Sequence, residues 1–214
     1  MRTVVVAGTG TEVGKTWVTA ELARALRRRG VPVAARKPVQ SFAPDATGPT
    51  DADVLGAATG EDPRAVCATH RWLPCAMAPP MAAVALGRAA FTIADLAAEI
   101  ADGIPANALV LVESAGGVRS PLADDGDTVA LVDALRPALV VLVADAELGA
   151  INLVRLSIDA LNGHRVVVHL NRFDPGDDLQ RRNRDWLVTR ESLEVVTDIE
   201  ALAEMLAALP AATG

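Results

Sequence analysis

The sequence predicts a doubly wound α/β fold, because apolar strand-like runs alternate along the chain with helical patterns. Three of these runs, residues 108–112, 138–144 and 166–170, are unbroken rather than alternating. Continuous apolar runs are typical of parallel strands that helices cover on both faces. We therefore expect one mainly parallel sheet in a three-layer, Rossmann-like arrangement, formed by a single domain over residues 1–214.

Each further element follows from its local pattern. Two shorter apolar runs, residues 3–7 and 33–36, complete the expected strands, and Pro38 closes the second. Apolar residues at helical spacing predict the helices, which are residues 16–29, 51–59, 93–101, 151–161 and 199–209. Residues 40–50 are expected to form a functional loop, and the Pro-rich residues 74–80 to be irregular.

Composition argues against several classes of function. The net charge is −7 and aromatic residues make up 3% of the chain, so we expect no nucleic-acid partner. No apolar run approaches the ~20 residues of a membrane helix, and the first residues lack the layout of a signal peptide. Two cysteines, Cys67 and Cys75, and three histidines predict neither a disulfide framework nor a histidine-based metal centre. We therefore expect a cytoplasmic protein with no membrane partner.

A glycine-rich turn follows the first strand, ends in Gly14-Lys15-Thr16 and opens a helix. Free backbone N–H groups and the helix dipole at such a turn attract phosphate. Lys15 would neutralise the β- and γ-phosphate oxygens, and the Thr16 hydroxyl would bind Mg²⁺. Five residues rather than the usual four separate Gly8 from Gly14, but the strand–turn–helix context still predicts the phosphate loop of a P-loop NTPase.

Three charged residues stand where ligands bind in doubly wound sheets, at the carboxyl ends of strands or at a helix start nearby. They are Lys37, Glu113 and Asp51. With Thr16, the two carboxylates could supply the oxygen ligands that Mg²⁺ prefers. Simpler interpretations stay open: Asp51 as a helix N-cap, Lys37 as a surface cation and Ser41 as an ordinary loop hydroxyl. A purely structural role is harder to argue for Glu113, because a carboxylate that ends a buried strand is costly unless it is paired or metal-bound.

Taken together, these features resemble the dethiobiotin synthetase family, which closes the ureido ring in biotin biosynthesis. The resemblance covers roughly residues 3–172 and includes that family's own longer spacing in the phosphate loop. The matching stretches are GTGTEVGKT (8–16), KPVQS (37–41), TDAD (50–53), VESAGG (112–117), LGAIN (148–152) and HLNR (169–172).

The resemblance implies an ATP-dependent ring closure that needs Mg²⁺. Diaminopelargonate takes up CO₂ as a carbamate on one amine, and a carbamate oxygen attacks the γ-phosphate. The second amine then displaces phosphate from the mixed anhydride to form the cyclic urea. Such chemistry needs positioning and positive charge around the transferred phosphoryl group more than it needs an acid–base side chain.

The resemblance also assigns roles to individual residues. It implies that the catalytic residues are Lys15, Lys37 and Thr11, and that Mg²⁺ is held by Thr16, Asp51 and Glu113. The implied nucleotide contacts are Glu12, Val13, Gly14, Lys15, Thr16, Trp17, Asp51, Glu113, Ser114, Ala115, Gly116 and Asn171, the last at the adenine edge. The implied substrate contacts are Ser41, Gly149, Ala150, Ile151 and Asn152. The last four would open a helix that reaches the substrate carboxylate of the other subunit in a homodimer.

Some residues depart from the family's usual pattern. Ser114 replaces a common Gly, while Pro80 and Leu153 stand where His is common. Residues 193–199 lack the usual segment that packs on the purine, so the base stays open among ATP, CTP and GTP. We expect the Trp17 side chain to pack in the core rather than to stack on a base.

Two other functions remain as alternatives. A switch-type ATPase that dimerises on nucleotide would carry a signature lysine where Gly10 stands, and the pairing of Lys37 with Ser41 also counts against it. A related amidoligase would activate a carboxylate with ATP. It would usually carry a glutamine amidotransferase domain with a catalytic cysteine, for which 214 residues leave no room.

Overall fold

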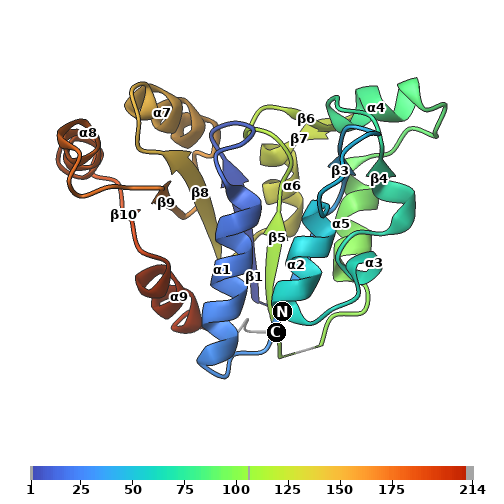
Figure 1. The fold of residues 1–214 in the computed structure, drawn as a ribbon, viewed down its shortest axis with the longest axis horizontal. Coiled ribbons are helices and arrows are strands. Elements are labelled where there is room, and N and C mark those ends of the chain that lie inside the picture. Colours follow the sequence, from blue (N-terminus) through green and yellow to red (C-terminus); the bar gives the residue numbers. More distant parts are fainter. Residues whose placement is uncertain (1, 106, 211–214) are drawn as a thin grey trace.

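A six-stranded sheet forms the centre of the molecule, in the order β10-β9-β8-β1-β5-β2 (Figure 1). The computed structural model describes residues 2–105 and 107–210. All neighbouring strands of this sheet are parallel, as predicted. The strands are β1 (Arg2–Gly8), β2 (Val33–Arg36), β5 (Leu109–Glu113), β8 (Leu139–Asp145), β9 (Val166–Asn171) and β10 (Val195–Val196).

Helices cover both faces of the sheet. Successive strand residues face opposite sides, so Val4 and Val6 pack against one helical layer while Val5 and Ala7 pack against the other. The first layer contains α1 (Lys15–Arg28), α2 (Asp51–Thr59), α3 (Pro63–Val66) and α9 (Ile199–Ala207). The second contains α5 (Ile93–Ala101), α6 (Thr128–Leu135), α7 (Ala150–Ala160) and α8 (Asp178–Thr189). The three-layer prediction is confirmed.

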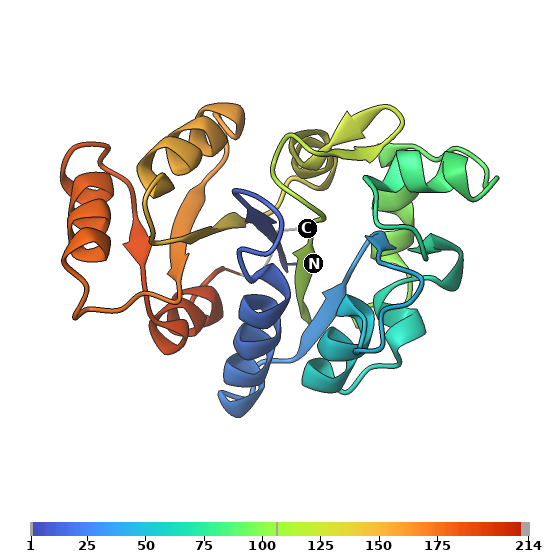
Figure 2. The same ribbon diagram turned by 45° about the horizontal axis from the view of Figure 1, so that its top comes forward.

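Smaller elements gather at the end of the sheet where the strands finish. Two-stranded sheets form there from β3 (Gln40–Ser41) with β4 (Trp72–Leu73), and from β6 (Pro121–Ala123) with β7 (Gly126–Asp127). Helix α4 (Pro79–Ala85) and a single 3₁₀ turn, Thr69–Arg71, complete the described elements. Figure 2 turns this end toward the reader, with the loop between β1 and α1 near its centre.

The strands and helices that the sequence predicted lie within two residues of the observed bounds, but several other expectations were wrong. The expected loop over residues 40–50 begins with a strand, β3, and the expected irregular segment over 74–80 already contains the start of α4. Helices α6 and α8 were not predicted. Cys67 and Cys75 are free thiols, in keeping with the sequence. Within the described ranges, no helix is both long enough and apolar enough to cross a bilayer.

Candidate active site

The loop between β1 and α1 closes tightly over the start of α1. Gly14 is the N-cap of this helix, with a left-handed φ of 92°. A Cβ at Gly14 would lie 2.1 Å from the amide nitrogen of Asn171, so only glycine fits here. Among the described residues, no side chain caps α1. The first N–H groups of the helix are therefore available to an anion.

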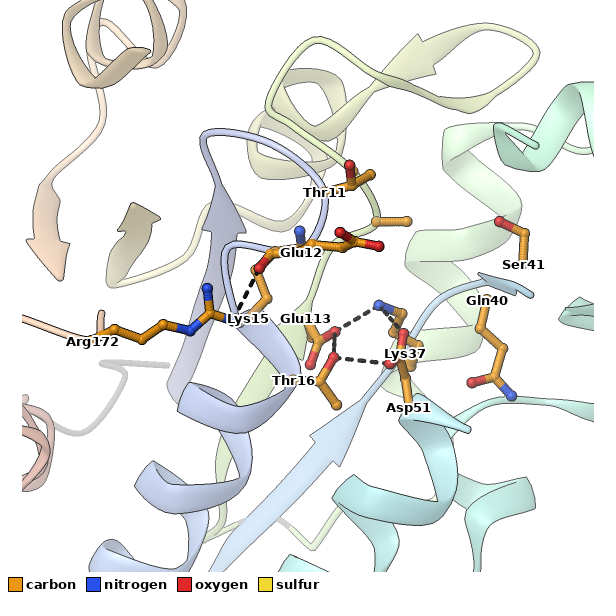
Figure 3. A pocket seen from close by; sticks show the side chains of 13 residues that line it. Thr11, Glu12, Lys15, Thr16, Lys37, Gln40, Ser41, Asp51, Glu113 and Arg172 are labelled. Atoms are coloured by element: carbon orange, nitrogen blue, oxygen red, sulfur yellow. Dashed lines mark hydrogen bonds and ion pairs between the residues drawn. The ribbon is translucent and has the colours of Figure 1, made fainter. Parts of the chain in front are cut away.

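A cavity of about 580 Å³ opens beside this loop (Figure 3). Its walls come from the loop, from the ends of several strands and from the starts of α1 and α2, as expected for ligand sites in doubly wound sheets. The lining residues are Thr11, Glu12, Gly14, Lys15, Thr16, Lys37, Gln40, Ser41, Asp51, Glu113, Ala115, Gly116 and Arg172. The sequence had singled out all of these except Gln40 and Arg172.

Four side chains form a hydrogen-bonded cluster in this cavity (Figure 3). The Thr16 hydroxyl lies 2.9 Å from Asp51 Oδ1 and 2.8 Å from Glu113 Oε1. The Lys37 ammonium lies 2.6 Å from Glu113 Oε1 and 2.8 Å from Asp51 Oδ2. Both carboxylates therefore share one hydroxyl and one ammonium group.

Burial makes this charge cluster strongly coupled. The side chains of Lys37 and Glu113 are only 3% and 0% exposed. Burial alone would lower the pKa of Lys37, but the two carboxylates outweigh it and raise that pKa above the ordinary value. Burial would likewise raise the pKa of Asp51, but the Lys37 ammonium holds it below its usual range. Lys37 and Asp51 are therefore both charged at neutral pH.

Lys15 has a different environment. Its ammonium group donates a 2.7 Å hydrogen bond to the Gly10 carbonyl at the tip of the loop. Burial, reinforced by the nearby Lys37 charge, lowers the pKa of Lys15 to about 8. An anionic ligand beside Lys15 would reverse this effect by favouring the charged form.

The structure excludes two of the simpler interpretations of these residues. Thr50, not Asp51, is the N-cap of α2, in a reciprocal capping box with Asp53. The N-cap interpretation of Asp51 is therefore wrong, as is the view of Lys37 as a surface cation. The Ser41 hydroxyl lines the cavity and lies 2.7 Å from the Met77 carbonyl oxygen.

The other predicted nucleotide residues lie around the same loop. Val13 and Ser114 are buried beside the cavity rather than among its lining residues. Asn171 is buried as well, and its amide donates a 3.0 Å hydrogen bond to the Val13 carbonyl. Trp17 is 54% exposed, so the expectation that its side chain packs in the core was wrong. By contrast, the side chain of the preceding residue, Thr16, belongs to the hydrogen-bonded cluster.

The predicted substrate residues of α7 do not join this cavity within one chain. Gly149, Ile151 and Asn152 line a separate cavity of about 530 Å³. Gly149 is the N-cap of α7 with φ of 95°, and among the described residues no side chain caps this helix. The single chain therefore places these residues apart from Ser41 and the lysines.

Sequence reasoning missed Gln40 and Arg172. Gln40 is buried, and its carbonyl oxygen accepts the Ala52 N–H at 3.0 Å, which fixes the first turn of α2 next to Asp51. Its position inside the KPVQS stretch was the available signal. Arg172 has a left-handed φ of 56° and donates to the Glu12 carbonyl at 3.3 Å. Nothing in the sequence predicts the left-handed backbone conformation of Arg172.

Solved structures share the fold at low sequence identity. The signal recognition particle receptor FtsY from Elizabethkingia anophelis matches 96% of this chain with a TM-score of 0.53 and 13% identity. Cell division protein FtsY from Thermotoga maritima matches 97% with a TM-score of 0.54 and 16% identity. The chain spans 65% and 68% of these two chains, respectively. Identities this low carry the fold alone.

Sequence comparisons are more specific. A family model described as an AAA domain matches residues 2–210. The ATP-dependent dethiobiotin synthetase BioD of Methylobacterium nodulans is 43% identical over 176 residues, which cover 78% of this chain and 77% of that protein. The proteins of the same name from Corynebacterium efficiens and Mycobacterium tuberculosis are 42% and 40% identical, over 75% and 78% of this chain and 70% and 71% of theirs. The chain therefore belongs to the family of ATP-dependent dethiobiotin synthetases.

Proposed function

We propose that this chain is an ATP-dependent dethiobiotin synthetase that works with Mg²⁺ as a homodimer. The observation that carries the proposal is the buried cluster of Lys37, Glu113, Asp51 and Thr16 beside the phosphate loop. In this cluster, oxygen ligands for a metal and positive charge for a phosphoryl group lie within hydrogen-bonding distance of one another. The identity of about 40% to relatives of that name supports the same reaction.

The residues of the cluster fit a hard cation such as Mg²⁺. Thr16, Asp51 and Glu113 offer only oxygen atoms, which Mg²⁺ prefers. Among the described residues, the buried Glu113 Oε2 has no hydrogen-bond partner, and an unpaired buried carboxylate oxygen is costly. We assign Mg²⁺ to these three residues. When bound, it neutralises charge on the phosphates of the nucleotide.

The chain's own residues position and neutralise the reacting groups. The carbamate oxygen forms a bond to the γ-phosphorus while the bond to the ADP oxygen breaks. The second amine then bonds to the carbamate carbon, phosphate leaves, and the amine loses a proton to solvent. Lys15 and Lys37 place ammonium groups where negative charge is transferred, and Thr11 and Ser41 offer hydroxyls from opposite walls.

For the nucleotide base we propose adenine, with Asn171 at its edge. The amide nitrogen of Asn171 is held by the Val13 carbonyl, which orients the side chain. Its carbonyl oxygen is then the acceptor we assign to the exocyclic amine of adenine. Competition between ATP, CTP and GTP in the assay below tests this choice, because cytosine presents a similar amine whereas guanine presents a carbonyl at the matching edge.

For the second subunit we propose that α7 of one chain completes the cavity of the other. Leu148, which precedes α7, and Leu153 and Leu156, which lie on it, are all exposed. Exposed apolar side chains grouped in this way are typical of protein interfaces. Helix starts attract anions, so Gly149–Asn152 would meet the carboxylate of a substrate whose amines lie near Ser41 and Lys37 of the partner chain.

The test of the reaction is phosphate release from ATP with Mg²⁺ and bicarbonate, with and without diaminopelargonate. We expect diamine-dependent release and a product with the mass of dethiobiotin. Lys37→Ala should abolish both, whereas Arg24→Ala, a change on the solvent side of α1, should keep both. Diamine-independent release that Lys37→Ala leaves unchanged would favour the switch-type ATPase.

The test of the dimer is complementation between two inactive variants. If each site combines Lys37 of one chain with Asn152 of the other, mixing Lys37→Ala with Asn152→Ala gives mixed dimers with one intact site each. Random exchange of subunits should then restore about a quarter of the wild-type activity. Mixtures that remain as inactive as the separate variants would contradict shared sites.

A further inference from the structure

The turn between β8 and α7, residues 146–149, is held from outside by hydrogen bonds from helix α8. Figures 1 and 2 both place α8 beside α7 at the outer end of the sheet. The buried residues of α8 are Gln180, Asn183 and Leu187, which lie on one face of the helix. Two of these three are amides rather than apolar residues. This face is therefore built to make hydrogen bonds as well as to bury surface.

Asn183 donates to two carbonyl groups of the turn. Its amide nitrogen lies 2.9 Å from the Ala146 carbonyl oxygen and 3.1 Å from the Glu147 carbonyl oxygen. The residue is only 7% exposed. Buried amides keep such positions only when they are hydrogen-bonded. Asn183 therefore fixes the path of the backbone just before Gly149.

Gln180 holds the side chain of the same turn. Its amide nitrogen donates to Glu147 Oε1 at 2.9 Å, and its carbonyl oxygen accepts the Asp174 N–H at 2.7 Å. It is 6% exposed. Both ends of the amide are thus occupied, which links the loop after β9 to the turn before α7. The two amides act on adjacent parts of one short segment.

We propose that Asn183 and Gln180 are positioning residues that set the start of α7, and through it the selectivity for a substrate that carries a carboxylate. This inference rests on the proposed function, in which Gly149–Asn152 meet the substrate carboxylate. The N–H groups at this helix start have no side-chain cap among the described residues, so their direction depends on the turn that precedes them. Asn183 and Gln180 hold that turn by its carbonyls and by its carboxylate.

A leucine at either position would bury as much surface as the amide does. The amides instead specify one backbone path, because their hydrogen bonds are directional. Loss of these bonds should therefore alter the recognition of the carboxylate more than it alters the chemistry at Lys37. The expected signature is a rise in KM for the diamino acid, with kcat and the KM for ATP nearly unchanged.

The test compares two substrates in steady-state kinetics: the diamino acid, and a vicinal diamine of the same chain length that lacks the carboxylate. In Asn183→Ala we expect kcat/KM for the diamino acid to fall by about tenfold. The value for the carboxylate-free diamine should stay unchanged. Gln180→Met, which keeps the size of the side chain but removes the amide, should shift selectivity in the same direction. Arg182→Ala is the matched control, since Arg182 also lies on α8 but, among the described residues, bonds only to Asp178.

Different results would refute the role of Asn183 and Gln180 and the proposed synthetase activity on which it rests. No diamine-dependent turnover by the wild type would refute the proposed function itself. A wild type that turns over both diamines equally well would overturn the inference alone. Equal losses for both diamines in Asn183→Ala and Gln180→Met would also overturn it, because a general structural defect does not distinguish the substrates. Thermal melts identify a variant that fails to fold, and the second variant then decides.

Discussion

Replacing Lys37 with methionine tests the charge cluster as a stabilising element, apart from catalysis. Methionine retains most of the volume but removes the ammonium that contacts Glu113 at 2.6 Å and Asp51 at 2.8 Å. Glu113 is 0% exposed, so the variant would leave a buried carboxylate without its cation. Breaking a buried pair in this way costs about 3–5 kcal/mol. Asp51 adds little to this figure, because its side chain is 39% exposed and remains hydrated.

The assay is urea unfolding without metal or nucleotide, applied to Lys37→Met, Glu113→Gln and the double variant. In parallel thermal melts of a chain of this size, the same loss should lower the melting temperature by about 6–20 °C. In the double variant most of the lost free energy should return, because neutral side chains replace both charges. The exposed-site variant Arg24→Met is the control. If the two single effects add to within about 0.5 kcal/mol, the two residues are not coupled and the reasoning fails.

The pH dependence of the Lys37–Asp51 pair follows from the directions of their two pKa shifts. The raised pKa of Lys37 gives stability that is fully present below the ordinary value of 10.5 and is lost only as pH rises through the folded value. The lowered pKa of Asp51 gives stability that is present above the ordinary value of 3.8 and is lost as pH falls through the folded value. The stability that the Lys37–Asp51 pair contributes, measured by urea unfolding, should therefore be flat between about pH 5 and pH 9.

Three further predictions concern the surroundings of the cluster. With the pKa of Lys15 at about 8 in the free protein, ATP binding near pH 8.5 should take up a proton; calorimetry in buffers of different ionisation enthalpy measures the uptake, and Lys15→Arg should show none. Gly14→Ala should destabilise the fold by about 1–3 kcal/mol because alanine is strained at the left-handed φ. The new Cβ would also clash with Asn171, and Asn171→Ala should remove that second loss. Urea unfolding of the single and double variants measures both losses, and a double variant no more stable than Gly14→Ala would refute the clash. Burial lowers the pKa of His169 to about 4, and because the unfolded chain binds the proton more tightly, stability should fall by about 2 kcal/mol between pH 7 and pH 5; in His169→Gln this loss should disappear, and an unchanged loss would assign it to other groups.

The sequence was sufficient for every strand of the central sheet except the edge strand β10, and for most of the residues that line the first cavity. Strands buried on both faces are continuous apolar runs, and such runs leave little doubt about where a strand ends. Lys37 and Glu113 directly follow or close such runs, so their meeting at one edge could be predicted. The phosphate loop carries its own glycine signal. These parts of the site are local in sequence, and only the parallel pairing of strands had to be assumed.

The parts that could not be predicted depend on contacts between distant segments. Helix α8 buries Gln180, Asn183 and Leu187, so its inward face lacks the apolar periodicity that reveals a helix. Trp17 is a large apolar residue at a helix start, and only the fold shows that its direction is outward. The left-handed backbone of Arg172 has no signature in a residue type that rarely adopts it.

The order of the strands also has a consequence for the synthesis of the chain. In the described sheet β5 lies between β1 and β2, so residues 33–36 have no neighbour to pair with until residues 109–113 have been translated. At common translation rates, that wait is on the order of 10 s. When β5 pairs with β2, it also brings Glu113 next to Lys37. Under the proposed assignment of Glu113 and Lys37 to the nucleotide site, a nascent chain that binds nucleotide has already paired β5 with β2, and nucleotide binding would report that pairing.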